Sequence, residues 1–373
     1  MTARPPAPVR WLLTAGLLAL AAACQPAGPQ VTVPEPGFRP ERLSDWGLIL
    51  RSGDRLVLGD GVEPYAVKTP LFTDYALKLR TYYLPPGGAI GYRERSSLDF
   101  PVGSVVTKTF FYPERDGVAV AAQDWDGDVA GLDLSRHRLI ETRLLVKRDD
   151  GWEALPYVWD GEDAYLRLTG AVQPMQVALP DGERTGLPYV VPARSECAGC
   201  HATNHTDGRL ELIGVKARHL NRPYAPGGPG QLAAWAARGD LHGLPDAARI
   251  PDVPAWNDAD APLDARARAY LDANCGHCHN PAGAADTSGL LLDAHTTAFR
   301  QLGYCKPPIA AGRGTGGRPY SIVPGAPDDS ILVYRMETTD PATRMPETGR
   351  SLTHREGVDL IRQWIATLPG RCV

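Results

Sequence analysis

The stretch from Asp264 to His279 reads DARARAYLDANCGHCH, and it decides how the last third of this 373-residue chain is expected to fold. Its first part, Asp264 to Asn274, predicts a helix with an acidic residue at its start. The helix runs directly into CGHCH at 275–279, which has the spacing C-x-x-C-H. A second motif of the same form, CAGCH at 197–201, stands about 75 residues earlier. The chain therefore repeats one cysteine–histidine motif in two different sequence settings.

This spacing is typical of covalent haem c attachment. Two thiols add to the vinyl groups of the porphyrin, and the adjoining histidine then lies below the iron as its proximal ligand. The residues concerned are Cys197, Cys200 and His201 in the first motif, and Cys275, Cys278 and His279 in the second. Zinc ribbons also pair C-x-x-C motifs, but at a spacing of roughly 15–20 residues. Zinc would not explain the histidine after each second cysteine, so the sequence predicts two haem c groups.

The N-terminus has the pattern of an export signal. Arg4 and Arg10 precede an apolar run that ends in small residues at Ala23, which predicts a signal peptide over 1–23. LAAAC at 20–24 resembles a bacterial lipobox, which would make Cys24 the lipidated first residue of the mature chain. The alternative is ordinary cleavage that leaves Cys24 as a spare thiol. By resemblance to lipoprotein sorting, Gln25 after the cysteine favours the outer membrane.

Two cysteines remain outside these motifs. Cys305 and Cys372 complete the seven cysteines of the chain. Export to an oxidising compartment permits them to pair, so we expect a disulfide that ties the C-terminus to a loop. The alternative is two inert thiols.

Composition and pattern divide the mature chain into four parts. Residues 24–40 are rich in proline and are expected to form a tether between the lipidated cysteine and the folded body. Residues 41–190 are rich in β-branched and aromatic residues with period-two alternation, which predicts an antiparallel β domain, either a sandwich or barrel-like. The clearest predicted strands are Ser104–Tyr112, Leu139–Val146, Trp152–Val158 and Ala164–Val172. The net charge of −4 offers no basic stripe, so no nucleic-acid partner is expected.

The two haem motifs fall in the remaining parts. Residues 191–255 form a first haem-binding segment with a short helix, Gln231–Arg238, and are expected to pack their haem against the β domain. Residues 256–373 contain the helix before the second motif and a further helix after Thr353. Thr353 and Glu356 have the spacing of a capping box, and Pro369-Gly370 ends this helix.

The C-terminal part resembles a class I cytochrome c domain. The resemblance rests on the helix leading into the second motif, on RMP at 344–346 and on the helix Glu356–Leu368. It implies that the first and last helices cross, that Met345 is the sixth ligand of the second haem, and that the Pro281 carbonyl accepts the ring N–H of His279. The expected fold class is therefore multidomain, an N-terminal antiparallel β domain followed by a mainly α cytochrome c domain.

The whole mature chain resembles a family of bacterial dihaem c-type cytochrome lipoproteins of unassigned role. The resemblance is carried by Pro70–Tyr75, Glu141–Leu145, Cys197–Asn204, Lys216–Arg222, Cys275–Gly283 and the tail from Pro324. The stretches in the β domain have no chemistry that the sequence alone reveals.

Residue types and positions suggest the remaining axial ligands. For the second haem, Met336 is the rival of Met345, although it follows the apolar run ILVY at 331–334. For the first haem, His219 in KARHLNR is favoured. His205, Met175 and an open five-coordinate iron remain alternatives. His277, inside the second motif, is expected to face solvent, and His354 is expected on the surface.

These features predict a dihaem c-type cytochrome that transfers electrons on the periplasmic side of the cell envelope, lipid-anchored to the outer membrane. Its partners would be redox proteins and, through the anchor, the membrane. A His/Met pair raises the reduction potential of a haem and suits electron transfer. The alternatives are a two-haem enzyme of the peroxidase type and the haem subunit of an envelope dehydrogenase, the β domain then serving for docking or substrate binding.

Overall fold

The computed structural model describes residues 28–125, 127–225, 227–309 and 311–373. The predicted signal peptide over 1–23 and the predicted lipid site at Cys24 lie outside these ranges. Among the described residues, no helix has the length and apolar character needed to cross a bilayer.

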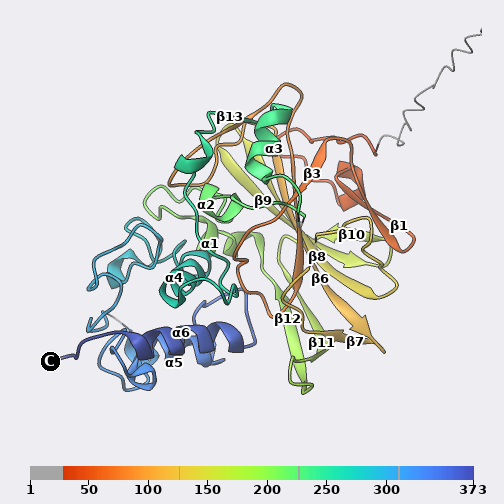
Figure 1. Ribbon diagram of the computed structural model, residues 1–373. Coiled ribbons are helices and arrows are strands. Elements are labelled where there is room, and N and C mark those ends of the chain that lie inside the picture. The colour runs from red at the N-terminus through yellow and green to blue at the C-terminus, as the bar shows by residue number, and fades with distance from the viewer. Residues whose placement is uncertain (1–27, 126, 226, 310) are drawn as a thin grey trace, which may run out of the picture.

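A curled sheet of nine strands dominates the molecule (Figure 1). Its path runs β10-β9-β8-β6-β7-β11-β12, with β4 also paired to β6 and β3 paired to β4. Its strands are β3 (Val62–Tyr65), β4 (Leu77–Tyr83), β6 (Val105–Arg115), β7 (Val118–Val120), β8 (His137–Arg148), β9 (Gly151–Asp160), β10 (Asp163–Leu166), β11 (Ala171–Ala178) and β12 (Arg184–Val191). All of these pairings are antiparallel except β7 with β11, which is parallel.

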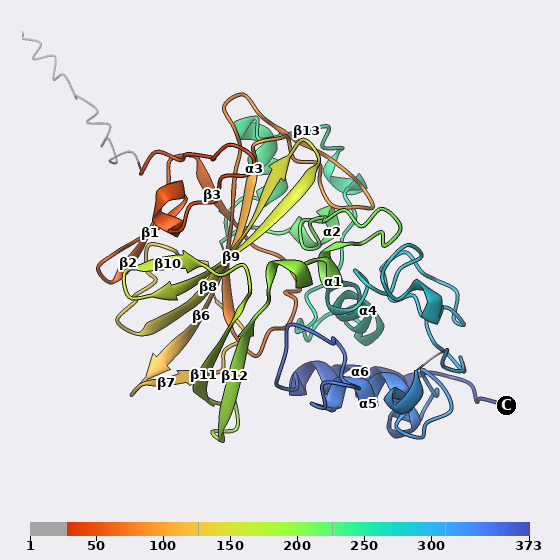
Figure 2. The ribbon, with the colours of Figure 1, turned by 180° about the vertical axis from the view of Figure 1, so that it is seen from behind.

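Alternating side chains give the sheet two apolar faces. One face carries residues such as Leu79, Val105 and Leu144 and is covered by η1 (Leu43–Trp46) and the hairpin of β1 (Ile49–Ser52) and β2 (Arg55–Leu58). On this face the Trp46 indole donates a hydrogen bond to the Tyr157 hydroxyl over 2.8 Å. The opposite face carries the other residues of the same strands and points toward the second half of the chain (Figures 1 and 2).

The described part of the predicted tether is packed against the sheet. The backbone N–H of Asp60 donates to the Pro29 carbonyl over 2.9 Å, and that of Thr32 donates to Trp46 over 3.0 Å. Further along, Arg148 donates to the Pro34 carbonyl over 2.7 Å. Prolines cannot donate these bonds, but their carbonyls accept them, so a proline-rich composition does not prevent docking here.

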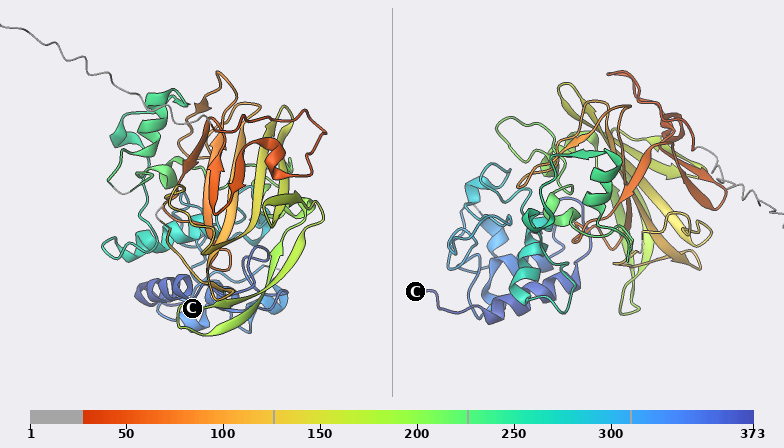
Figure 3. Two further views of the ribbon diagram at one scale, coloured as in Figure 1. Left: turned by 90° about the vertical axis from the view of Figure 1, so that its right-hand side faces the viewer. Right: turned by 45° about the horizontal axis from the view of Figure 1, so that its top comes forward.

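The segment after the sheet lies on the opposite face (Figure 2). It contains η2 (Arg194–Glu196), α1 (Ala198–His201), α2 (Ala217–Leu220), α3 (Gln231–Arg238) and η3 (Ala247–Arg249). Its β13 (Leu241–His242) pairs in parallel with β5 (Ile90–Gly91). Leu220, Trp235 and Leu241 share one core with Tyr82 and Val106 of the sheet, so this segment and the sheet form one packed unit (Figure 3).

The C-terminal part contains α4 (Leu263–Asn274), α5 (Ile331–Glu337) and α6 (Arg355–Thr367), with short turns η4 (Asp286–Ser288), η5 (Gly312–Thr315) and η6 (Pro327–Asp329) between them. α4 and α6 pack together: Tyr270 and Leu271 lie in one core with Leu360 and Trp364. The Trp364 indole also donates to the Asp264 carboxylate over 2.8 Å.

The predicted capping box at the start of α6 is wrong. The Thr353 hydroxyl donates to the Glu337 carbonyl over 2.8 Å, and the Glu356 carboxylate accepts from the Tyr75 hydroxyl over 2.8 Å. The residue before the helix is His354, which makes no side-chain cap. Both side chains of the predicted pair have found partners in other parts of the fold.

The predicted fold class, a β domain followed by a mainly α cytochrome c domain, is also wrong. The molecule is mostly β, with 26% strand against 20% helix, and six α-helices are present in the described ranges. In the described part of the chain, only α4 and α6 exceed eight residues. The long connections between them are rich in glycine and proline, residues that interrupt helices, so the C-terminal part is a few helices joined by extended loops.

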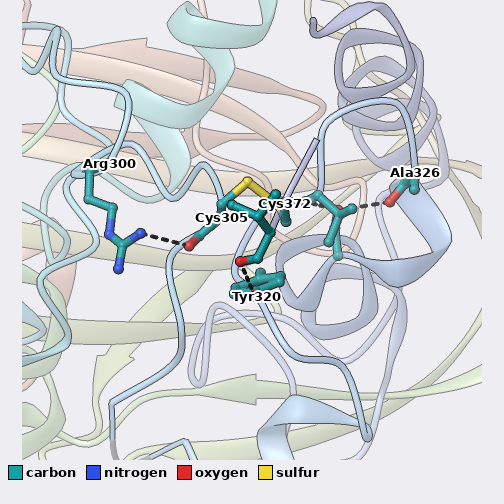
Figure 4. The surroundings of a disulfide bond; sticks show 8 residues. Arg300, Cys305, Tyr320, Ala326 and Cys372 are labelled. Atoms are coloured by element: carbon teal, nitrogen blue, oxygen red, sulfur yellow. Dashed lines mark hydrogen bonds between the residues drawn. A yellow bond between two sulfur atoms is a disulfide. The ribbon is translucent and has the colours of Figure 1, made fainter. Parts of the chain in front are cut away.

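Cys305 and Cys372 form a disulfide with sulfur atoms 2.16 Å apart (Figure 4). It closes a separation of 67 residues. Around it, Arg300 donates to the Cys305 carbonyl over 3.0 Å, and Tyr320 donates to the Val373 carbonyl over 3.3 Å. The last residues of the chain are therefore held against the loop that follows the second C-x-x-C-H motif.

Candidate functional site

The fold brings the two C-x-x-C-H motifs into contact. The Cys278 sulfur lies 3.3 Å from the Gly199 carbonyl oxygen, which it faces as a hydrogen-bond donor. Just after the two motifs, the backbone N–H of His205 donates to the Ala282 carbonyl over 2.9 Å. All four motif cysteines are free thiols. Two segments about 75 residues apart in sequence thus form one site.

Local structure explains how each motif is presented. η2 leads into α1, so Cys197 starts a single helical turn that also carries Cys200 and His201. In the second motif Cys275 ends α4, and its N–H donates to the Leu271 carbonyl over 2.8 Å. Each motif is a short turn held by a helix end.

A first cavity, called cavity 1 here, lies between the first motif and the sheet. It has an empty volume of about 1460 Å³, part of it open to solvent. Its walls include Cys197, Cys200, His201 and His219, together with Lys108 of β6. Both thiols and the histidine of the first motif therefore line one hollow between the motif and the sheet.

A second cavity, cavity 2, lies between the second motif, α4 and α5. Its empty volume is about 1570 Å³, again partly open. Its walls include Cys275, Cys278, His279, Met336 and Met345.

The two cavities share part of their walls. The residues that line both are Cys200, His277, Pro346 and Thr348. Two groups bound in these cavities would be separated by a thin layer of side chains.

Each predicted proximal histidine is oriented by a backbone carbonyl. The Nδ1–H of His201 donates to the Glu211 carbonyl over 2.7 Å, and that of His279 donates to Leu290 over 3.1 Å. In each ring this leaves Nε2 as the nitrogen available to a metal. The carbonyl expected from the resemblance was that of Pro281, and that expectation is wrong, because the chain after the motif turns back through Leu290 instead.

The surroundings keep both histidines neutral. Removal from water, together with the nearby Lys108 ammonium, lowers the pKa of His201 to about 4. Burial also lowers the pKa of His279. A neutral imidazole is the form that binds a metal ion.

His219, the residue favoured as sixth ligand of the first haem, lies on cavity 1 and is 3% exposed. Its Nε2–H donates to the Asp272 carboxylate over 2.8 Å, while its Nδ1 is buried and has no hydrogen-bond partner among the described residues. Arg218 also binds Asp272, through two contacts of 2.7 and 2.9 Å. A carboxylate behind a histidine that keeps its other nitrogen free is a common second layer of metal sites.

The rival residues for the first haem lie elsewhere. His205 directs its Nδ1 at the carbonyls of Ala282 and Gly283, 3.2 and 3.1 Å away. Met175 belongs to the apolar cluster at β11 and β12. Neither side chain lines cavity 1.

Both methionines considered for the second haem line cavity 2. Met336, on α5, is 7% exposed and packs in the apolar core of α4 and α6. Met345 lies in the loop before α6, where its N–H donates to the Arg335 carbonyl over 2.7 Å and its carbonyl accepts from Arg350 over 3.0 Å. Met345 is thus held by its backbone rather than by core packing.

Two histidines expected at the surface are buried. His277 is 4% exposed and lies in the wall between the cavities, and its Nδ1 has no hydrogen-bond partner in the described ranges. His354 is 8% exposed and stacks on Phe72 at a ring distance of 4.3 Å. Neither has a sequence pattern that marks it as buried, because the groups that cover them come from distant parts of the chain.

The stretches of the N-terminal half that carry the resemblance, one in the loop between β3 and β4 and one in β8, converge on this site. Arg143 lines cavity 1 and Phe72 lines cavity 2. Asp74 accepts from the backbone N–H groups of Ser351 and Leu352, both over 2.7 Å. These stretches therefore form the cavity walls and hold the loop that contains Met345.

No protein-family model, curated protein or solved structure matches this chain. Among the described residues, no group of three or more His, Cys, Asp and Glu side chains is placed to bind one metal ion. The arrangement instead pairs two thiols and one carbonyl-oriented histidine with a partly open cavity, and does so twice. These residues fit two covalently attached haems.

Proposed function

We propose that this protein is a dihaem c-type cytochrome that passes electrons from one haem to the other in the bacterial cell envelope. The observation that carries the proposal is the common wall of the two cavities. Residues Cys200, His277, Pro346 and Thr348 line both, so haems in the two cavities would be close neighbours.

Haem, once bound, supplies reversible one-electron chemistry at its iron. The chain contributes attachment, orientation and ligation. The four motif cysteines would fix the two porphyrins, and the carbonyls of Glu211 and Leu290 hold His201 and His279 in the tautomer that leaves Nε2 available. His219 and Met345 are the proposed sixth ligands, and with them both irons would be closed to small molecules.

The two ligand sets give the proposal a direction of flow. Methionine as the second axial ligand raises the reduction potential of a haem. The second haem, with His279 and Met345, is therefore expected to have the higher potential, and electrons would pass from the first haem to the second.

The proposed location rests on the sequence of the N-terminus. The export signal over 1–23 and the lipobox-like LAAAC at 20–24 support a lipid-anchored protein on the periplasmic side, with the outer membrane favoured by Gln25. Its partners would be redox proteins that deliver electrons to the first haem and accept them from the second.

The first test is an electron paramagnetic resonance spectrum of the oxidised, purified protein, read together with its haem content. Two haems per chain and two low-spin signals are expected. One high-spin signal beside one low-spin signal would contradict the relay and favour a two-haem enzyme with an open iron. Fewer than two haems per chain would overturn the proposal as a whole.

A matched pair of substitutions tests the ligand of the second haem. Met345→Ala is expected to leave both haems attached and to convert one of them to high spin, because Met345 would be the sixth ligand. Met336→Ala removes a core side chain and is expected to cost about 2–5 kcal/mol of stability while leaving both haems low-spin. The reverse pattern of spin states would assign the ligand to Met336.

A further inference from the structure

Three cationic side chains stand side by side on the floor of cavity 1. Arg80 of β4 lies directly opposite Lys108 of β6, and Lys108 lies directly opposite Arg143 of β8. All three line the cavity. Like charges in directly opposed positions on neighbouring strands destabilise a sheet. The cost of this row must therefore be offset by other groups of the chain or by a bound ligand.

The chain offsets only one of the three charges. Arg143 makes two hydrogen bonds, of 2.7 and 2.6 Å, to the fully buried carboxylate of Glu141. Arg80 has a single weak contact, 3.4 Å from its Nη1 to the Lys78 carbonyl. Lys108 lies 5.3 Å from the Phe110 ring, and neither Arg80 nor Lys108 has an ion pair in the described ranges of the chain.

The position of the row on the sheet explains its burial. On the same face, the neighbouring row toward one end is Lys78, Phe110 and Glu141, and toward the other end it is Tyr82, Val106 and Leu145. Phe110 belongs to one apolar cluster of this face and Tyr82 and Val106 belong to another. The cations therefore occupy the gap between two apolar clusters, where cavity 1 opens.

Charges in this gap act on the first haem motif. Burial, together with the neighbouring guanidinium groups of Arg143 and Arg80, lowers the pKa of Lys108 to about 7. Lys108 and Arg143 both lower the pKa of His201. A further cation, Lys216, lines the same cavity, while the acidic side chain on its wall is that of Glu196, which is exposed.

We propose that Arg80, Lys108 and Arg143 form an anion site on the floor of cavity 1 that binds carboxylate groups, namely the two propionates of the first haem. Charge-assisted hydrogen bonds from guanidinium and ammonium groups to carboxylates are among the strongest that proteins make. The inference rests on the proposed function, because it takes a haem in cavity 1 as given. It adds the residues that orient this haem and raise its potential.

The test is a spectroscopic redox titration of the haem-loaded protein. At pH 6, below the pKa of about 7 of Lys108, Lys108→Gln and Arg80→Gln are each expected to lower the equilibrium constant for reduction of one haem by about tenfold, the effect of a unit charge over roughly 10 Å at an effective dielectric constant of about 20. Lys108→Arg keeps the charge and is expected to keep the wild-type potential. Arg138→Gln, an exposed cation on β8, serves as the matched control.

The outcomes separate this inference from the function on which it rests. Two attached haems with unchanged potentials in both Gln variants would overturn the anion site and leave the dihaem assignment intact. A haem content below two in the wild type would overturn the proposed function itself.

A diffusible oxyanion is the competing ligand for this anion site. Titration of the loaded wild-type protein with inorganic phosphate tests it, and no change in the haem absorption spectrum is expected. A spectral change in the wild type that Lys108→Gln abolishes would assign the row to a free anion and overturn the propionate assignment.

Discussion

At the scale of single residues, His354 shows how strongly the fold changes the properties of one side chain. Its Nδ1 lies 2.9 Å from the Tyr270 hydroxyl, and its Nε2 lies 3.8 Å from the Glu356 carboxylate. The Tyr75 ring packs against it edge-on. Burial, with a smaller effect of the Lys78 charge, lowers the pKa of His354 to about 3.

This shift predicts a pH dependence of stability. The unfolded chain would take up a proton at His354 near pH 6.5, whereas the folded chain would take it up only near pH 3. Stability from this group is therefore complete above about pH 6.5 and is lost as the pH falls toward about 3, with a slope of up to about 1.4 kcal/mol per pH unit.

Urea unfolding of the wild type and of His354→Gln between pH 7 and pH 5 measures the effect. The variant is expected to be less stable than the wild type at pH 7. As the pH falls, its free energy of unfolding should decrease less steeply than that of the wild type, by the slope that belongs to one proton. His242→Gln, at an exposed histidine, is the control and should keep the wild-type slope. Equal slopes for His354→Gln and the wild type would show that His354 titrates normally in the fold.

At the scale of elements, the crossing of α4 and α6 depends on a small residue. Gly357 of α6 faces Tyr270 of α4, and a Cβ atom added there would overlap the Tyr270 hydroxyl oxygen and lie 2.5 Å from Nδ1 of His354. Gly357→Ala is therefore expected to force the helices apart and to cost about 1–3 kcal/mol.

Thermal or urea unfolding measures this cost. The control is the same substitution at a glycine that has space around it. Gly186→Ala, on strand β12, meets only the Gln176 side chain at 3.7 Å. This control is expected to be neutral or slightly stabilising, since alanine loses less backbone entropy than glycine in a strand. A Gly357→Ala variant as stable as the control would mean that the helices cross with room to spare.

The elements also show what the sequence can predict. Gln231–Arg238 was expected to be a helix and α3 has these bounds, because its apolar spacing and the glycine after it are local signals. The predicted strand Ser104–Tyr112 lies within β6 apart from its first residue, for the same reason. Where a side chain had a choice of partners, as Thr353 and Glu356 did, local spacing gave the wrong answer.

The site was predictable only as far as its motifs. Cys197, Cys275 and their neighbours stand out in the sequence because the C-x-x-C-H spacing is a local signal, one that is typical of haem c attachment. The row of Arg80, Lys108 and Arg143 was not, because it depends on strand register between residues far apart in sequence. The burial of His277 was not predictable either. It lies between the two cavities, where segments far apart in sequence meet, so no local sequence pattern marks it.

At the scale of the whole molecule, the disulfide closes the C-terminal part. The segment between Cys305 and Cys372, which are 67 positions apart in sequence, includes α5, α6 and the loop with Met345. Closing a loop of this length removes entropy from the unfolded chain worth roughly 4 kcal/mol. The double variant Cys305→Ser and Cys372→Ser is expected to be destabilised by about this amount.

Unfolding with and without a thiol reductant provides the control. Reduction should destabilise the wild type and leave the double variant unchanged, since the variant has no bond to break. If the reductant frees both thiols and the stability of the wild type does not change, the disulfide does not stabilise the fold.

The docking of residues 28–34 on the sheet has a consequence for how the protein would sit on a membrane. From Cys24 to Gly28 the backbone spans at most about 14 Å. With the proposed lipid at Cys24, the bilayer would lie beside the face of the sheet that η1 and the β1–β2 hairpin cover (Figure 1). The protein would then be held in one orientation relative to the membrane, because no long linker separates the lipid from the folded body. The two C-x-x-C-H motifs lie on the other side of the sheet, so under the proposed function electrons would be exchanged with partners in the aqueous periplasm.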